Sequence, residues 1–227
     1  LTLAAALVAA APAHAAPQLR SWTTTGDKSQ LLAAQAPSGV VAADAVAGLP
    51  VVAVDAKERH QTMVGFGAAI TDASAWLIQN RLTPAQRDGL LRELYGRGEG
   101  DLGFSFTRVT IGASDFSLDH YSLDETPNGA ADPALQQFSL KRPQEFVFPT
   151  VRAALKINPE LKVMASPWSA PAWMKTTGSL VKGQLKPEAY PVYADFFARY
   201  IKEARKVGVP TDYLSIQNEP DFEPDNY

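Results

Sequence analysis

Three short runs of polar and aromatic side chains follow apolar segments of the sequence. The first run has Arg108 within an apolar stretch and Asp115 just beyond it, the second has Trp168, and the third has Asn218 and Glu219. Aromatic rings stack on the apolar face of a sugar, while amides and carboxylates bond its hydroxyl groups. The three runs together therefore favour a carbohydrate as the ligand.

Glu219 has the surroundings expected of a general acid in glycosidic bond cleavage. Such cleavage needs two carboxyl groups, one of which protonates the leaving oxygen. In an enzyme that retains the anomeric configuration, the other attacks the anomeric carbon from about 5–5.5 Å away. Asn218 and Pro220, on either side of Glu219, would fix the direction of its side chain. A general acid must stay protonated near neutral pH, which burial favours, so we expect Glu219 to be buried.

The elements that must position these residues alternate between strands and helices from about residue 61. Thr83, Pro84 and Gln86 predict a capped helix that ends at Gly96. Further helices are predicted from about residue 143 and from about residue 191. The predicted strands are residues 63–67, 104–111, 161–166 and 213–218.

Strands that alternate with long helices are parallel and joined by right-handed crossovers. Four such units over residues 61–227 make about half of a (β/α)₈ barrel, which takes ~250 residues in all. A small doubly wound sheet is the alternative. In a barrel enzyme the active site lies where the strands end, which is where the three polar runs occur.

The first sixty residues differ from the rest. Residues 1–15 are an apolar, Ala-rich segment closed by Ala13-His14-Ala15, which predicts a signal peptide and a secreted or periplasmic protein. Residues 16–60 contain short apolar stretches broken by turn residues and are expected to form β structure beside the main domain. The sequence has no cysteine, so disulfides and thiolate metal sites are excluded.

Charge and histidine usage limit the possible partners. The formal net charge is −3, which gives no indication of nucleic acid or of an anionic membrane surface. The apolar segment at residues 1–15 is too short to span a bilayer. His60 and His120 lack metal-ligand spacing. We therefore expect no metal ion and no organic cofactor, and no stable membrane insertion.

Two further side chains are predicted to be structural. Thr71 and Asp72 precede a helical segment and are expected to cap it. Trp173 is expected to pack in the core or to anchor a loop.

Four ordered motifs between residue 60 and the end of the sequence resemble glycoside hydrolase family 30. The motifs are Gly65–Ala73, Phe106–Ser117, Ala165–Lys175 and Gln217–Pro220. Their order and spacing match those of the family, and the last is the family's acid/base motif. Asn-Glu-Pro alone is less specific, because many retaining barrel glycosidases share it.

The resemblance implies a (β/α)₈ barrel with an attached β-sandwich built from both chain ends, so residues 16–60 would supply its first strands. It implies retention through a covalent glycosyl-enzyme, with Glu219 as the acid/base and Asn218 beside it. Asp115 and Trp168 would line the pocket for the reacting sugar, and Arg108 would orient the nucleophile. The family's nucleophile is a glutamate on the seventh strand, beyond Tyr227, so the sequence is expected to be an inactive N-terminal fragment.

Within the family, the motifs resemble the glucosylceramidase and β-1,6-glucanase branches more than the glucuronoxylanase branch. We therefore expect a glucosylceramidase-like β-glucosidase acting on a carbohydrate or glycolipid. An endo-β-1,6-glucanase is the nearest alternative. A different class of function also remains open, namely a non-catalytic carbohydrate-binding protein on the same fold.

Overall fold

The protein divides into two compact units, residues 1–60 and residues 61–227. The structure is a computed structural model. It describes residues 18–40, 48, 50, 52–53, 55–222 and 225. The predicted signal peptide, residues 1–15, lies outside the described residues.

The first unit contains short antiparallel strands. Strand β1 (Gln18–Leu19) pairs with β4 (Ser38–Gly39), and β2 (Trp22–Thr23) pairs with β3 (Ala33–Ala34). That these strands belong to a β-sandwich stays a prediction.

The second unit is built on a parallel sheet. Its strands are β5 (Gly67–Ile70), β6 (Phe106–Thr110), β7 (Lys162–Ser166) and β8 (Tyr213–Leu214). They are hydrogen-bonded in the order in which they occur along the chain. This sequential order is that of a barrel, whereas a doubly wound sheet reverses its strand order at a switch point.

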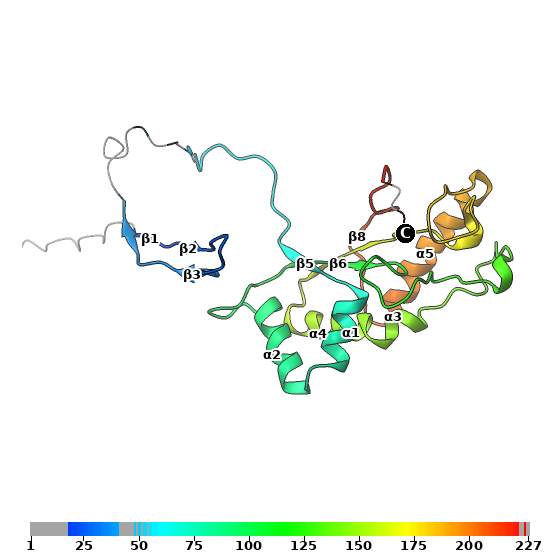
Figure 1. Ribbon diagram of the computed structural model, residues 1–227, viewed down its shortest axis with the longest axis horizontal. Helices are drawn as coiled ribbons and strands as arrows, with labels where there is room; N and C mark the ends of the chain where they lie inside the picture. Colours follow the sequence, from blue (N-terminus) through cyan, green and yellow to red (C-terminus); the bar gives the residue numbers. More distant parts are fainter. Residues whose placement is uncertain are drawn as a thin grey trace, which may run out of the picture. The chain divides into compact units, whose positions relative to one another are not determined.

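Helices connect the strands, and Figure 1 shows α1, α2 and α4 on one side of the sheet. The capping box predicted for α2 is confirmed, because Thr83 and Gln86 satisfy each other's backbone N–H groups and Gly96 is the C-cap. The predicted helix from residue 143 is two helices, α3 and α4. The helix bounds are Asp72–Asn80 (α1), Pro84–Tyr95 (α2), Lys141–Glu145 (α3), Val147–Ile157 (α4) and Tyr190–Lys206 (α5).

Alternate residues of β6 and β7 have opposite environments. One set is at most 1% exposed and belongs to the core beneath the helices: Thr107, Val109, Val163 and Ala165. Arg108 and Met164, which are partners in the sheet register, are only half-buried. Because successive side chains of a strand point to opposite faces, Arg108 lies on the face away from the helices.

The first strand begins later than predicted. The sequence favoured residues 63–67, but β5 starts at Gly67, and Met63, Val64 and Phe66 are exposed. The pairing with β6 sets this boundary, because Gly67 is the register partner of Phe106. A Cβ atom on Gly67 would lie 1.4 Å from the Phe106 carbonyl oxygen, so a glycine is required at this close approach.

Candidate active site

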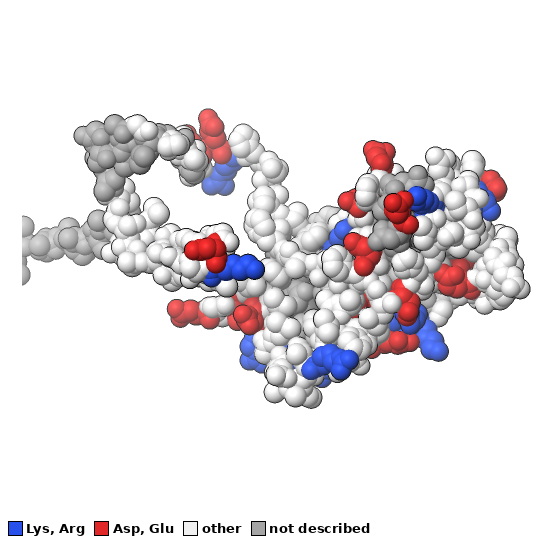
Figure 2. Space-filling model, viewed as in Figure 1, with Lys and Arg blue, Asp and Glu red and all other residues white. Residues whose placement is uncertain are grey.

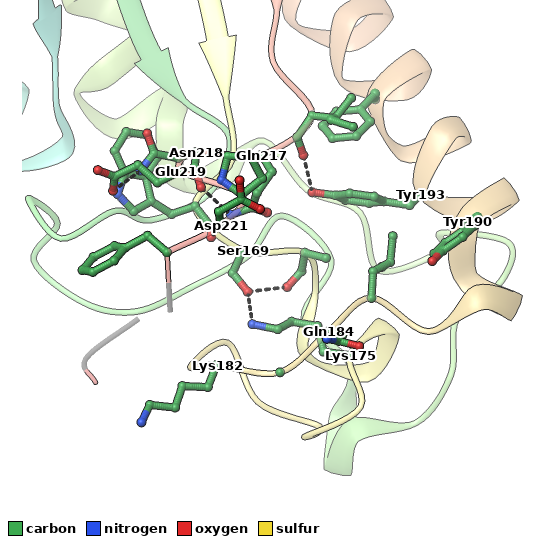
Figure 3. A pocket seen from close by; sticks show the side chains of 18 of the residues that line it. Ser169, Lys175, Lys182, Gln184, Tyr190, Tyr193, Gln217, Asn218, Glu219 and Asp221 are labelled. Atoms are coloured by element: carbon green, nitrogen blue, oxygen red, sulfur yellow. Dashed lines mark hydrogen bonds between the residues drawn. The ribbon is translucent and has the colours of Figure 1, made fainter. Parts of the chain in front are cut away.

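A cavity of about 790 Å³ lies at the C-terminal ends of β7 and β8 (Figure 3). Four residues predicted from the sequence line it: Asp115, Trp168, Asn218 and Glu219. Its other polar lining includes Ser169, Lys175, Lys182, Gln184, Gln217 and Asp221, and its aromatic lining includes Tyr190, Tyr193, Phe197 and Phe222. The loops that follow three strands therefore meet at one hollow, as the barrel prediction requires.

Arg108 does not line the cavity but holds two of the residues that do. Its Nη2 donates to the Oδ1 of Asn218 at 2.8 Å and to the Oγ of Ser166 at 2.9 Å. Its guanidinium carbon lies 4.6 Å from the centre of the Trp168 ring. Burial lowers the pKa of Arg108, while the negative charge of Glu219 acts in the opposite direction.

Asn218 connects Arg108 to the predicted general acid. While its Oδ1 accepts from Arg108, its Nδ2 donates to Oε2 of Glu219 at 3.0 Å. Its backbone N–H donates to the carbonyl oxygen of Pro167 at 2.8 Å. The amide therefore has a fixed orientation, with its oxygen toward the cation and its nitrogen toward the carboxylate.

Gln217 is a positioning residue that we did not identify from the sequence. Its Nε2 donates to the carbonyl oxygens of Trp168 at 2.7 Å and Asn218 at 3.0 Å. It thus joins the loop after β7 to the loop after β8. Its place in the Gln217–Pro220 motif was the only signal for it in the sequence.

Glu219 is exposed among the described residues, and its burial in the whole protein stays a prediction. It follows β8, the last of the four strands in the described sheet. Its backbone has a φ of 45°, in the left-handed region that residues other than glycine rarely adopt. The backbone of Glu219 is therefore held by its surroundings, and such strain is concentrated at functional sites.

Asp72 is fully buried and is the first residue of α1, so the predicted capping role falls to Thr71 alone. The cap of α1 is the Thr71 side chain, which accepts from Ser74 N. Asp72 accepts from the hydroxyl of Tyr121 at 3.1 Å and from the backbone N–H of Leu118 at 3.3 Å. Burial raises the pKa of Asp72. This carboxyl group anchors the loop that carries Asp115.

Trp173 anchors a loop, as the sequence predicts. Its Nε1 donates to Oδ2 of Asp124 at 2.8 Å, and both side chains are buried. Burial raises the pKa of Asp124, while the bond from Trp173 lowers it. This contact ties the long loop after β6 to the segment after β7, which carries Trp168.

On the face drawn in Figure 2, acidic and basic side chains are interspersed, whereas a nucleic-acid surface needs continuous positive charge. Across the described ranges, no three His, Asp or Glu side chains are grouped so that they could hold a metal ion. In the same part of the chain, no helix is long and apolar enough to cross a membrane.

Residues 63–226 match the glycosyl hydrolase family 30 TIM-barrel domain. The chain belongs to glycosyl hydrolase family 30. The resemblance predicted from the four motifs is thereby confirmed, and the parallel sheet of the second unit corresponds to part of the family's (β/α)₈ barrel.

Relatives named for two different activities are similar to this chain. An endo-1,6-β-D-glucanase of Aspergillus fumigatus is 35% identical over 190 residues, covering 76% of this chain and 38% of the relative. The lysosomal acid glucosylceramidase of Mus musculus is 31% identical over 171 residues, covering 72% of this chain and 32% of the relative. The chain thus spans about a third of the length of the curated relatives it matches.

Two solved structures have a fold similar to that of this chain. The endo-β1,6-glucanase BT3312 superimposes with a TM-score of 0.70 at 32% identity, covering 88% of this chain and 42% of that one. SrfJ from Salmonella typhimurium gives a TM-score of 0.67 at 31% identity, covering 73% of this chain and 36% of that one.

Proposed function

We propose that the protein hydrolyses β-glucosidic bonds with retention of configuration, using Glu219 as general acid and then general base. The observation that carries the proposal is the meeting of Asp115, Trp168, Asn218 and Glu219 at one cavity, with Glu219 hydrogen-bonded to Asn218. Membership of family 30 supports the same chemistry.

In the first step, the Glu219 carboxyl protonates the glycosidic oxygen as its bond to the anomeric carbon breaks, and a carboxylate attacks that carbon from the other face. In the second step, Glu219 takes a proton from water as the water displaces the carboxylate. Arg108, through its bond to Asn218, keeps the carboxyl of Glu219 aimed at the same place in both steps.

We propose that the attacking carboxylate comes from outside residues 1–227, since the match covers only 32% and 38% of the length of two relatives. Asp115 and Asp221 are the other carboxylates that line the cavity. We assign Asp115 to binding sugar hydroxyls beside Trp168, because both residues follow strand ends on the barrel face that holds the site.

Two substrate classes fit the relatives, one of which is named a glucosylceramidase and the other an endo-1,6-β-glucanase. The motifs resemble both branches, and we place a glucosylceramidase-like β-glucosidase first and an endo-β-1,6-glucanase second. The apolar segment at residues 1–15 supports export to the periplasm or the medium. Residues 16–60 are proposed to supply strands of a β-sandwich beside the barrel.

The stereochemistry of the first product tests the proposal. The full-length protein is incubated with β-1,6-glucan and, separately, with glucosylceramide, and the newly formed reducing end is followed by proton NMR. Retention predicts that the β-anomer appears first and later equilibrates. An initial α-anomer would contradict the assignment of a double-displacement mechanism, and a protein that binds these glycans without cleaving them would be a carbohydrate-binding protein.

A further inference from the structure

The segment that carries Asp115 is closed at its base, and we call residues 113–121 the rim loop. Ala113 N donates to the carbonyl oxygen of Tyr121 at 2.9 Å, which joins the two ends of the rim loop. Between these ends, Asp115 is exposed and lines the cavity. The place of the Asp115 carboxylate therefore depends on what holds the rim loop from outside.

The start of α1 holds the rim loop by three hydrogen bonds. Oδ1 of Asp72 accepts from the hydroxyl of Tyr121 at 3.1 Å, and Oδ2 accepts from the backbone N–H of Leu118 at 3.3 Å. Ala73 N donates to the carbonyl oxygen of Phe116 at 2.9 Å. Because Asp72 is fully buried, its carboxylate is costly to leave without these donors. Movement of the rim loop away from α1 is therefore costly as well.

Helix α3 holds Tyr121 from another direction. The guanidinium carbon of Arg142 lies 4.8 Å from the centre of the Tyr121 ring, and Nη2 of Arg142 pairs with Oδ2 of Asp119 at 3.0 Å. Tyr121 is only 8% exposed. Its ring thus lies against a cation while its hydroxyl donates to the buried carboxylate of Asp72. These contacts fix both the position of the ring and the direction of the hydroxyl.

We propose that Asp72 and Tyr121 are positioning residues that set the affinity for the reacting sugar through Asp115, without touching the sugar themselves. Neither residue lines the cavity, whereas Asp115 does. A hydrogen bond weakens steeply when its distance or angle departs from the optimum, so a small shift of the rim loop weakens the bonds from Asp115 to sugar hydroxyls. This inference rests on the proposed function, in which Asp115 binds those hydroxyls.

Tyr121→Phe tests the inference, because it removes the hydroxyl that donates to Asp72 and keeps the ring against Arg142. In the full-length protein, kcat and KM are measured on 4-nitrophenyl β-glucoside. KM is expected to rise about 3- to 10-fold, which corresponds to one neutral hydrogen bond, while kcat changes less than about twofold. Asp72→Asn should act in the same direction, since its amide nitrogen must face one of the two donors.

Asp115→Ala shows whether the effect passes through Asp115. Once this carboxylate is absent, its displacement has no consequence, so adding Tyr121→Phe to Asp115→Ala should change KM less than about twofold. Tyr95→Phe is the matched control. It removes the hydroxyl of another buried tyrosine, which is 2% exposed, belongs to α2 and does not line the cavity, so KM should stay as in the wild type.

The inference is wrong if Tyr121→Phe leaves KM unchanged, or raises it equally with and without Asp115. It is also wrong if kcat falls at constant KM, because a smaller fraction of folded enzyme gives that result. A wild-type protein that hydrolyses no β-glucoside would contradict the proposed function. The dissociation constant of methyl β-glucoside, measured by NMR, then replaces KM with the same expected changes, and an absence of binding would contradict the inference as well.

Discussion

The guanidinium of Arg108 donates a hydrogen bond to Oδ1 of Asn218, 2.8 Å away and 110 positions later in the chain. The same side chain covers the Trp168 ring, and Asn218 passes the contact on to Glu219. One cation on β6 thus orients side chains that follow β7 and β8. The proposed acid depends on this arrangement, because the bond from Arg108 directs the Asn218 oxygen away from Glu219 and the amide nitrogen toward it.

The first prediction concerns Arg108→Lys. Lysine keeps the positive charge but loses the planar fork that stacks on Trp168 while bonding Asn218. Loss of one charge-assisted hydrogen bond is worth about 1.5–3 kcal/mol, so kcat/KM of the full-length enzyme should fall about 10- to 100-fold. Steady-state kinetics on an aryl β-glucoside measure this change.

Arg81→Lys is the control for that variant. Arg81 lies over the Trp76 ring at 4.8 Å, which is a similar stacking contact in α1 and its C-cap. It should leave kcat/KM within about twofold of the wild type, since surface substitutions away from a site have small effects. Equal losses of kcat/KM in Arg81→Lys and Arg108→Lys would contradict a specific role of Arg108 at the site, because they would show that stacking on an aromatic ring affects only stability.

The second prediction uses two glycines with opposite surroundings. Gly67→Ala places a Cβ 1.4 Å from the Phe106 carbonyl oxygen, so β5 must separate from β6 and the protein should lose cooperative folding. Gly89→Ala in α2 meets no atom within 4 Å and should stabilise the protein by about 0.5–1 kcal/mol. Urea denaturation followed by circular dichroism measures both, and a stable, cooperative Gly67→Ala variant would contradict the observed register.

The third prediction concerns the pH dependence of stability caused by Asp124. Burial raises its pKa in the folded protein above the usual value of 3.8. At pH values between the pKa of Asp124 in the unfolded chain and its higher pKa in the folded protein, the unfolded chain holds fewer protons than the folded one. The free energy of unfolding therefore falls as the pH rises through this interval. The loss of stability caused by ionising the buried Asp124 is absent below pH 3.8 and complete above the pKa of Asp124 in the folded protein.

Asp124→Asn imitates the protonated acid and keeps an oxygen to accept from Trp173 Nε1. We expect its free energy of unfolding to rise relative to the wild type between pH 4 and pH 7, as measured by urea denaturation. Asp124→Leu, which removes the acceptor, should instead cost about 1–3 kcal/mol at both pH values. A difference between Asp124→Asn and the wild type that does not change with pH would contradict the raised pKa.

Features set by neighbouring residues were predictable from the sequence. The capping box of Thr83 and Gln86 involves residues three positions apart, and its prediction is confirmed. The order of the strands and their parallel pairing followed from strand–helix alternation. The four strand-end residues that line the cavity were also identified, because parallel strands bring their C-terminal ends to one face.

Features set by distant residues were not predictable in this way. The start of β5 depends on the close approach of Gly67 to Phe106, which only the register reveals. The burial of Asp72 depends on Leu118 and Tyr121, more than forty positions away.

The central claim is that Glu219 donates the proton to the leaving group. In the full-length protein, Glu219→Gln should reduce kcat on a β-glucan by at least about 100-fold, because general acid catalysis contributes about 10²–10⁴-fold. Formation of the glycosyl-enzyme from a dinitrophenyl β-glucoside, whose leaving group needs little protonation, should change far less in pre-steady-state measurements. An equal loss of that first step on both substrates would show that Glu219 is not the acid.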